Sequence, residues 1–527
     1  IQLLSDVSFS NADKGCKSTA PFSEPNAWPN VRVRITENPG KPAELMGCSG
    51  DNFAIRPNAL VNVAVSDGGA WDVAGTARAL NDTSFGTVTH KAGRPVSVRA
   101  AAVNAAATPA ITTNYTGAQT AALTQCAGAA CTATQGVLTL NTGFSAGQLA
   151  SDVASYAEVG SFALELTDTT FANVDQFDGT PADCSTAGRY ICQQGGPIAV
   201  GRFVPDHFAL AYNIPSFATA CPAGAHTYVG QAFGYSVAPL ITATAQNAAN
   251  APTLLYAGPH WRITDAVLAA VGNKTYSAAA GALNTSAAPV PDPAILPAGN
   301  GVGTLAFSAG TGFRFDRTTP VAPFHADISL AINVIDQDGV AYAGNPARFA
   351  AATPGNGIAF TSGKQMRFGR LMIGSANGSQ LLPLRLPIET QYWSGTSFVT
   401  NTADSCTAIA ATNIGYSNYT QNLTDTPACE TSTLVGGNFA AGRGTLKLSA
   451  PGHGNNGGVD VTVNLAGATA GATCTAQGAP PGTPASAGFP YLQVRGPGGN
   501  YDQNARARAR FGAYRASEEF IDVREVF

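Results

Sequence analysis

Charged side chains are scarce in this sequence. They make up 12% of its 527 residues, about half the share that is usual in soluble proteins. The formal net charge is −4, and basic residues first gather near the end of the chain, at Arg506, Arg508 and Arg510. A nucleic-acid-binding surface needs many Lys and Arg residues to displace counterions from phosphates. The composition therefore excludes nucleic acid as the expected partner, and we interpret the three arginines as one solvated face of a strand.

Long apolar runs and helical periodicity are also missing. No run approaches the roughly 20 apolar residues that a membrane-spanning helix needs, so we expect no membrane-spanning segment. The Ala-rich segments 100–110 and 243–251 contain Asn-Ala-Ala and Pro, and we interpret them as strand and turn. Because the sequence begins at Ile1 without Met or a signal peptide, we expect a mature or trimmed form.

Alternation of apolar and polar residues dominates what is present. It is clearest in 459–465, 328–334 and 384–388, where Val, Leu and Ile occupy every second position. Such segments bury one face and expose the other, as in antiparallel sheets that pack in pairs. The predicted fold class is all-β, with tandem immunoglobulin-like β-sandwich domains stapled by disulfides.

Length and internal similarity predict several domains. A chain of 527 residues exceeds what one hydrophobic core usually serves. Residues 99–117 are echoed by 242–258, as a strand, an Asn-Ala turn, an aromatic residue and a Gly. We therefore predict an N-terminal β segment or partial sandwich at 1–52, a sandwich at 53–202, its repeat at 203–350, and a C-terminal sandwich at 351–527.

Ten cysteines indicate an oxidising compartment. Their even number and short separations are typical of disulfide loops, and no C-x-x-C pair suggests a zinc site. Connectivity stays open, although Cys16 with Cys48 and Cys406 with Cys429 are natural local pairs. The candidates are Cys16, Cys48, Cys126, Cys131, Cys184, Cys192, Cys221, Cys406, Cys429 and Cys474.

Catalytic and metal motifs are weak. The segment 143–147 fits the G-x-S-x-G pattern, but strand-like sequence follows it where a nucleophile elbow requires a helix. Asp336 and Asp338 resemble the opening of a calcium loop, yet the distal Glu ligand is missing and Asp-Gly equally predicts a hairpin turn. We expect no catalytic residues and no cofactor, with calcium at Asp336 and Asp338 as a weak alternative.

Aromatic residues offer one further kind of site. Trp28, Trp71, Trp261 and Trp393 are candidates for stacking on sugars, although a Trp in a sandwich more often belongs to the core. The scattered histidines His207, His260, His325 and His453 lie near no nucleophile at a recognisable spacing, so we interpret them as structural.

One block of sequence is distinctive. "MRFGRLMIGSANGSQLLPLRLPIETQYWSGTSFVTNTADSCT" (366–407) resembles the hallmark block of the MshQ-like family, whose namesake is encoded with a mannose-sensitive haemagglutinin type IV pilus. "GRFVPDHFAL" (201–210), "YAEVGSF" (156–162) and "ARFGAYRASEEFIDVREVF" (509–527) are similar to the family as well. Relatives often have an Asp-rich stretch before the last strands, whereas 494–509 keeps only Asp502.

The resemblance implies a large exported β-rich protein of Gram-negative bacteria, associated with type IV pili. We therefore expect a non-catalytic adhesion or assembly protein that is extracellular, cell-surface or pilus-associated after export through the periplasm. The expected partners are pilus subunits or copies of the chain itself, with surface glycans as a further candidate. Two alternatives stay open: a structural subunit of an extracellular filament, and a surface polysaccharide-binding protein or glycoside hydrolase.

Overall fold

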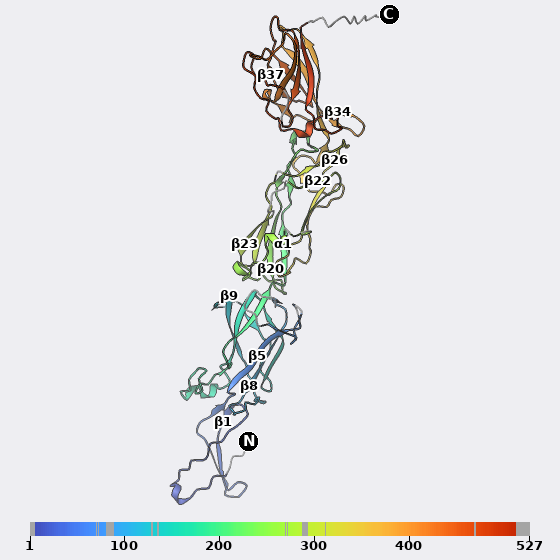
Figure 1. Ribbon diagram of the computed structural model, residues 1–527. Helices are drawn as coiled ribbons and strands as arrows, with labels where there is room; N and C mark the ends of the chain where they lie inside the picture. The colour runs from blue at the N-terminus through green and yellow to red at the C-terminus, as the bar shows by residue number, and fades with distance from the viewer. Residues whose placement is uncertain are drawn as a thin grey trace.

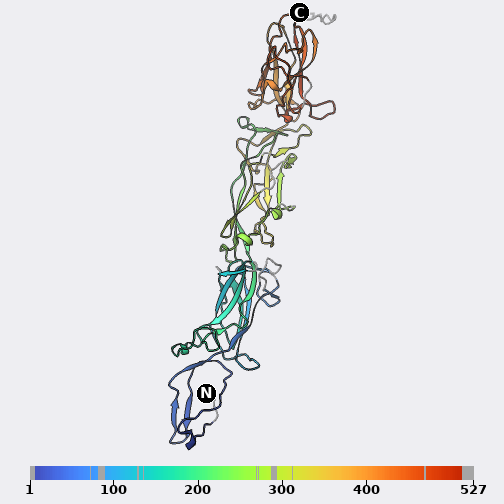
Figure 2. The same ribbon diagram turned by 60° about the vertical axis from the view of Figure 1, so that its left-hand side comes forward.

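The protein is a long rod. A computed structural model describes residues 6–69, 71, 73–80, 89–127, 130–133, 136–268, 270, 272–286, 293–310, 312–467 and 471–512, with the backbone alone at 125–127 and 130–133. Three β-sandwiches follow one another end to end, with the N-terminal segment beyond the first of them (Figures 1 and 2). We call them the first (59–204), second (207–367) and third (369–511) sandwich.

The N-terminal segment (6–58) is mostly exposed. It contains η1 (Asn11–Asp13), the pair β1 (Trp28–Val31) and β4 (Phe53–Ile55), and the hairpin of β2 (Arg34–Glu37) and β3 (Leu45–Cys48). Among the described residues of the stretch 6–52, Ala27 alone joins a buried apolar cluster. This stretch therefore lacks a core of its own.

The first sandwich has two sheets whose strands pair mainly antiparallel. One has the order β11-β12-β8-β5-β6 and the other the order β10-β9-β13-β15-β7, with β14 beside β13. Their bounds are β5 (Ala59–Asp67), β6 (Arg78–Ala79), β7 (His90–Lys91), β8 (Val96–Val103), β9 (Thr120–Ala127), β10 (Ala130–Ala133), β11 (Leu138–Thr139), β12 (Gln148–Tyr156), β13 (Gly160–Asp168), β14 (Ile191–Cys192) and β15 (Ile198–Val204). η2 (Asn173–Phe177) lies between β13 and β14.

The second sandwich has main sheets of order β16-β20-β24-β23 and β21-β27-β28. Their bounds are β16 (His207–Tyr212), β20 (Leu240–Gln246), β21 (Lys274–Ala278), β23 (Ala294–Gly299), β24 (Val302–Ala306), β27 (Ile328–Ile332) and β28 (Ala347–Phe349). The shorter elements are β17 (Ser216–Phe217), η3 (Pro222–Gly224), β18 (His226–Tyr228), β19 (Tyr235–Val237), η4 (Gly258–His260), α1 (Asp265–Leu268), β22 (Leu283–Asn284), β25 (Arg314–Phe315), β26 (Phe324–His325), β29 (Ala359–Phe360) and β30 (Gln365–Arg367).

The third sandwich has sheets of order β31-β33-β39-β37, with β34 beside β33, and β32-β41-β40-β36. Their bounds are β31 (Gly369–Ile373), β32 (Ala376–Gly378), β33 (Leu384–Trp393), β34 (Phe398–Thr400), β36 (Ile414–Gln421), β37 (Thr433–Val435), β39 (Arg443–Leu448), β40 (Gly457–Val463) and β41 (Ala505–Phe511). η5 (Ala411–Asn413), η6 (Pro490–Leu492) and the pair β35 (Ala408–Ile409) and β38 (Gly437–Asn438) complete it.

The three sandwiches share one topology. In each, the first strand pairs with the second, which pairs with the strand of a later hairpin: β5-β8-β12, β16-β20-β24 and β31-β33-β39. A short strand after the first then pairs in parallel with the last strands of the domain, as β7 with β15, β18 with β30 and β32 with β41. This two-sheet arrangement is immunoglobulin-like, and the predicted all-β tandem fold is confirmed.

A glycine turn recurs at the same place in each sandwich. The turn glycines have left-handed backbone angles: Gly147 (φ +73°), Gly301 (φ +76°) and Gly442 (φ +76°). A Cβ on any of them would lie 2.4 Å from a backbone oxygen of the loop that follows the second strand. Only glycine permits so close an approach of two backbone segments. The similar segments 99–117 and 242–258 each contain the loop that approaches this glycine. The third sandwich has the same contact between a glycine turn and a loop.

Each sandwich has its own buried apolar cluster. Leu60, Val98 and Phe162 belong to the first, Phe217, Phe313 and Leu330 to the second, and Leu386, Val461 and Phe511 to the third. The predicted alternation is confirmed in β27 and β33, whose inward residues are buried. In β40 the intervening Thr462 is buried as well, between Gly415 of β36 and Arg506 of β41.

The cysteines pair differently from the two local pairs that we expected. Cys406 bonds to Cys221 in the second sandwich, and Cys429 bonds to Cys474, so the expected Cys406 to Cys429 pair is wrong. Proximity in sequence misled the expectation, because the fold brings β18 and the loop before β35 together. Cys184 bonds to Cys192.

The other expected local pair is absent as well. Cys16 and Cys48 are free and exposed, so the expected bond between them is not present. Cys126 and Cys131 face each other in the register of β9 and β10, and their side chains lie outside the described residues.

Two further observations concern boundaries and membranes. β29 and β30 pair with strands of the second sandwich, which thus continues past the expected boundary at residue 350. Within the described ranges, no helix has the length and apolar character needed to cross a bilayer; α1 is a single turn.

Candidate functional site

The four tryptophans do not gather at one site. Trp28 lies exposed on β1, in the N-terminal segment. Trp71 packs against the core of the second sandwich from the loop after β5, and Trp261 packs there with its indole N–H donating to a backbone carbonyl at 2.9 Å. Trp393 packs edge to face on Phe398, 5.2 Å between ring centroids. Sugar stacking stays a prediction, and Trp28 has the most accessible ring of the four.

The carboxylate of Asp336 serves the turn that contains it. It accepts hydrogen bonds from the Tyr256 hydroxyl at 2.8 Å and from the backbone N–H of Asp338 and Val340, both at 2.9 Å. Burial is the main cause that raises the pKa of Asp336, to about 6. The Asp-Gly sequence forms the tight turn that the hairpin alternative predicted, with Gly339 at φ +77°.

The carboxylate of Asp338 is held by two arginines. Arg202, from β15 of the first sandwich, grips it with two hydrogen bonds of 2.8 and 2.6 Å. Arg262 forms an ion pair with it at 3.1 Å. Two guanidinium groups beside a carboxylate oppose the approach of a cation, so this donor set does not fit calcium. The weak calcium candidate at Asp336 and Asp338 is replaced by a contact between two sandwiches.

This ion pair belongs to the first junction, where no flexible linker separates the sandwiches. β15 ends at Val204 and β16 begins at His207. The carboxylate of Asp206, between them, accepts from the Arg94 guanidinium at 2.6 Å and contacts the His207 ring nitrogen at 2.9 Å. Hydrogen bonds from Arg94 and His207 outweigh burial and lower the pKa of Asp206. The short connection is thus tied to both sandwiches.

The loop after β20 docks on the end of the first sandwich. Its Asn247 amide donates to the carbonyl of Ala157 at 3.1 Å. The Glu158 carboxylate accepts the backbone N–H groups of Leu254 and Leu255 at 3.0 and 3.1 Å. The apolar core continues through the contact, because Val159 of the first sandwich belongs to the cluster of the second. The first junction is therefore a packed and hydrogen-bonded interface.

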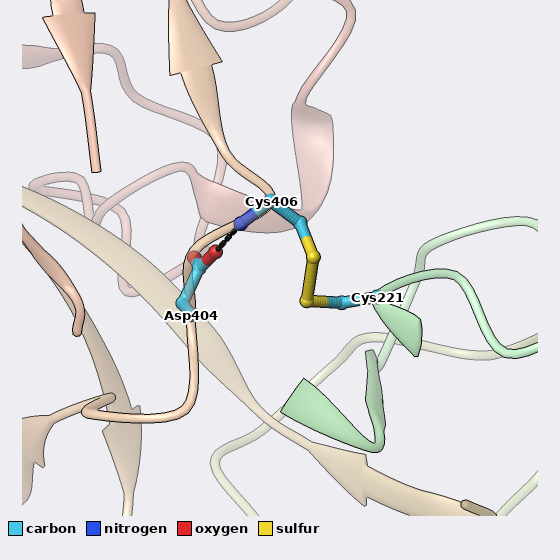
Figure 3. Close-up of side chains that lie close together, drawn as sticks. All are labelled: Cys221, Asp404 and Cys406. Carbon is cyan, nitrogen blue, oxygen red and sulfur yellow. Dashed lines mark hydrogen bonds between the residues drawn. A yellow bond between two sulfur atoms is a disulfide. The ribbon is translucent and has the colours of Figure 1, made fainter. Parts of the chain in front are cut away.

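A disulfide crosses the second junction. Cys221, just before η3 of the second sandwich, bonds to Cys406 in the third over a sequence separation of 185 (Figure 3). Gly224 allows the two backbones to meet, since a Cβ there would lie 2.0 Å from the carbonyl oxygen of Ala403. The carboxylate of Asp404 accepts the backbone N–H of Cys406 at 3.0 Å and so fixes the turn that carries the Cys406 sulfur of the disulfide.

A buried polar network surrounds this disulfide. The Tyr228 hydroxyl donates to Asp404 at 2.7 Å and accepts from the Asn401 amide at 2.7 Å. The same amide nitrogen lies 3.0 Å from His226 Nε2, while His226 Nδ1 lies 3.2 Å from the carbonyl of Gly224. A carbonyl can only accept, so Nδ1 carries the proton and Nε2 accepts from the amide. The ring is thus neutral in this arrangement.

Burial and hydrogen bonds set the protonation states of the network. Burial is the main cause that lowers the pKa of His226, and it raises that of Tyr228 well above its usual value. For Asp404 burial alone would raise the pKa, but hydrogen bonds from Thr407, Tyr228 and backbone N–H groups lower it overall. Tyr228 is therefore a neutral donor to an ionised carboxylate.

Arg317 closes the other side of the second junction. Its guanidinium donates to the carbonyls of Tyr501, Gly369 and Gln493 at 2.7, 2.9 and 2.8 Å. It also lies over the ring of Phe368, 4.5 Å from the centroid. Burial lowers the pKa of Arg317 to about 10, so it stays charged at neutral pH. One side chain of the second sandwich thus binds three backbone segments of the third.

Cys221, Asp404 and Cys406 bring ligand-type atoms within 4.8 Å of one another. The two sulfur atoms are joined in a disulfide and offer no thiolate, and the carboxylate already accepts four hydrogen bonds. This group is structural and does not fit a metal ion.

The residues that matter most here were not predicted as site residues. Arg202, Tyr228, Arg317, Asn401 and Asp404 each carry an inter-domain contact. A signal for some of them was present, because "GRFVPDHFAL" contains Arg202, and "NTADSC" contains Asn401, Asp404 and Cys406. The distinctive motifs thus coincide with the junctions.

Comparisons with solved structures give weak likenesses to two adhesins. FdeC, a broadly conserved adhesin of Escherichia coli, is 13% identical with a TM-score of 0.30, covering 83% of this chain and 99% of that one. The adhesin InvE of Yersinia pseudotuberculosis is 12% identical with a TM-score of 0.16, covering 58% of this chain and 61% of that one. No curated protein matches the sequence.

Family models match most of the chain. Residues 158–362, from the turn before β13 to just after β29, match the third domain of DUF6701. Residues 367–526 match the fourth domain of DUF6701 and contain the third sandwich. The chain therefore carries the third and fourth domains of the DUF6701 family.

Proposed function

We propose that the chain is a stiff, non-catalytic arm that holds adhesion or assembly contacts away from the surface of a Gram-negative bacterium. The observation that carries the proposal is the pair of junctions, each fixed by buried side chains. Domains in one chain move relative to one another unless their interface is large and well packed. A chain whose junctions are fixed in this way transmits position and force along its length.

Composition and disulfides support an extracellular location. Three disulfides lie among the described residues, and such bonds persist outside the cytoplasm. The MshQ-like resemblance supports association with type IV pili, and we propose pilus subunits or other copies of the chain as partners.

One sheet edge is suited to such a partner. β23 is the edge strand of its sheet, and its sequence AILPAG carries no charge and leaves Leu296 exposed. Exposed edges pair with added strands unless charges or coverings prevent it. By contrast, the edge strand β36 is covered by Ala472, which bonds to Tyr416 in both directions. We propose that a partner strand adds to β23.

The test is binding of the purified chain to piliated cells and to isolated pili, with a Leu296→Lys variant beside it. The proposal expects binding that this substitution weakens, with Val153→Lys, exposed on β12, as the matched control. If the chain binds a glycan array instead, and Trp28→Ala abolishes that binding, the polysaccharide-binding alternative replaces it. Absence of binding to cells, pili and glycans contradicts the proposal.

A further inference from the structure

One sheet of the third sandwich carries a row of arginines on its outer face. β41 places Arg506, Arg508 and Arg510 on this face, while its alanines and Phe511 belong to the core. Alternate residues of a strand lie about 7 Å apart, so the three guanidinium groups follow one another along β41. We call these three residues the arginine row; it presents positive charge at regular intervals.

The sheet that carries the arginine row does not neutralise it. Asp460 is the single acidic residue in the four strands β32, β36, β40 and β41. Its carboxylate pairs with Arg508 at 3.0 Å and lies 3.9 Å from the guanidinium of Arg506, whose side chain is 63% exposed. Arg510 is exposed and has no ion-pair partner within the described part of the chain. Three cations beside one carboxylate leave an excess of positive charge on this face.

The middle of the row is fixed by the protein itself. Arg508 donates to the Asp460 carboxylate at 3.0 Å and to the Asn418 carbonyl at 2.8 Å. The Thr420 hydroxyl accepts a third hydrogen bond from it, at 2.8 Å. The guanidinium lies against Gly458, where a Cβ would be 2.9 Å from two of its nitrogens. The two outer arginines are therefore the ones whose donors are open to a ligand.

Amide and hydroxyl groups flank the row. Asn377 lies opposite Arg510 in the register of β32 and β41. On the other side, the Asn418 amide donates to Asp460 at 2.8 Å. None of the four strands, all of which the structure describes, exposes a large apolar side chain. Such a face can hydrogen-bond a polar anion, and it offers no apolar patch to a lipid bilayer or to the core of a protein interface.

These features distinguish between classes of anionic polymer. A nucleic acid is bound through many phosphate contacts and through bases that stack on exposed aromatic rings. The row has few cations, and its four strands expose no aromatic ring. An acidic polysaccharide repeats a carboxylate along a chain of hydroxyl groups. A guanidinium binds a carboxylate through two parallel hydrogen bonds, and neighbouring amides and hydroxyls can bind the sugar hydroxyls.

We propose that the outer face of the β32-β41-β40-β36 sheet binds an acidic polysaccharide, with Arg506 and Arg510 pairing with its carboxylates. Arg508 and Asn377 lie beside them and hydrogen-bond the sugar units. The site uses none of the side chains that hold the second junction, and it lies on a different sandwich from β23. The inference adds a ligand class to the arm described above, and it rests on that function only for placing the third sandwich outside the cell.

The experiment is biolayer interferometry of the full chain on immobilised alginate, a polymer of uronic acids, with dextran as the neutral polysaccharide. The proposal expects binding to alginate that weakens as salt rises, because salt screens paired charges, and no binding to dextran. Arg506→Gln/Arg510→Gln should weaken the binding at least about tenfold, since it removes both open guanidinium groups. Both side chains are exposed, so the melting temperature should stay that of the parent chain.

A matched control is Arg385→Gln/Arg443→Gln, which removes two exposed arginines from the other sheet of the same sandwich. This variant loses the same charge and should bind alginate like the parent chain. Equal losses in the two variants would show that binding follows net charge, and they overturn the proposal. Absence of binding to alginate overturns it as well. So does binding to DNA or to phosphatidylglycerol vesicles that is tighter than binding to alginate and is lost in Arg506→Gln/Arg510→Gln.

Two further variants separate this site from the others. Trp28→Ala should leave alginate binding unchanged, because the arginine row needs no sugar stacking on that ring. A chain that binds pili but not alginate loses this inference and keeps the proposed function. A chain that binds alginate through the row, and whose pilus binding is insensitive to Leu296→Lys, keeps this inference and loses the proposed strand addition at β23.

Discussion

The two junctions hold neighbouring sandwiches with different chemistry. At the first, Arg202 grips Asp338 and Arg94 grips Asp206 through charged hydrogen bonds. At the second, a disulfide and a buried hydrogen-bond network around Asp404 hold the sandwiches together. A guanidinium fork fixes orientation through its planar geometry. A disulfide limits separation but leaves rotation to be fixed by other contacts, which here are the hydrogen bonds of Tyr228 and Asn401.

Of the changes considered, removing the disulfide between Cys221 and Cys406 should lower the free energy of unfolding the most. It closes a loop with a sequence separation of 185, for which chain entropy predicts a contribution of about 5 kcal/mol to the free energy of unfolding. We expect Cys221→Ser/Cys406→Ser to lower the urea midpoint of the second and third sandwiches strongly.

The control for this prediction is the short disulfide of the first sandwich. Cys184→Ser/Cys192→Ser opens a separation of only 8 and should cost about 2 kcal/mol. Equal losses in the two double variants would show that loop length does not set the contribution.

Breaking the buried ion pair is the matching test at the first junction. Asp338→Asn leaves the Arg202 guanidinium, whose side chain is 5% exposed, beside a neutral amide. We expect the free energy of unfolding to fall by about 3 to 5 kcal/mol. Asp152→Asn, which breaks the exposed pair with Arg99, should cost less than about 1 kcal/mol. If both variants lose the same small amount in urea denaturation, the buried pair does not stabilise the junction.

Removing the Tyr228 hydroxyl tests the hydrogen-bond network of the second junction. Tyr228→Phe removes one donor and one acceptor from a buried network and leaves Asp404 and Asn401 short of a partner. We expect a loss of about 1 to 3 kcal/mol in the free energy of unfolding. Tyr416→Phe, inside the third sandwich, is the control that leaves the junction unchanged. The two variants should differ in the angle between sandwiches, measured by small-angle scattering.

The smallest expected effect is a dependence on pH. Burial lowers the pKa of His226 below 6.5, so the unfolded chain binds this proton at a higher pH than the folded one. The contribution of the neutral ring is complete above pH 6.5 and is lost as pH falls toward the lowered pKa. A further loss follows below pH 3.8, where the unfolded form of Asp404 is protonated first.

Urea midpoints across this pH range, with His226→Asn and His325→Asn compared, measure the effect. His325 is exposed and serves as the control. The change between pH 6.5 and lower values should be smaller in His226→Asn than in His325→Asn. It should not vanish, because burial also lowers the pKa of His90 and of His260, which both variants keep. The opposite result would place the titrating group elsewhere.

Period-2 alternation was enough to predict the strands, because burying one face of a sheet leaves a local mark in the sequence. Ile328, Leu330 and Ile332 are fully buried, as predicted. The edge strand β23 was missed, since its Pro-containing and uncharged sequence resembles a loop. Alternation predicts each strand by itself and cannot predict how one sandwich contacts the next.

The junctions were hidden for a related reason. Their partners lie far apart in sequence, 136 residues between Arg202 and Asp338 and 176 between Tyr228 and Asp404. No local pattern connects such pairs, so Asp338 resembled a calcium ligand and Cys406 seemed to belong with Cys429. The pairing of such residues across an interface becomes visible only when the fold brings the two segments together.

The most direct test of the central claim, that the sandwiches form one stiff rod, is pulsed electron paramagnetic resonance on spin-labelled cysteines. Labels at exposed Val153 and Leu296 report on the first junction, and labels at Leu296 and Val435 on the second, with Cys16 and Cys48 replaced by Ser. The account predicts one narrow distance distribution for each pair. Broad distributions, unchanged by Asp338→Asn or by Cys221→Ser/Cys406→Ser, would contradict it.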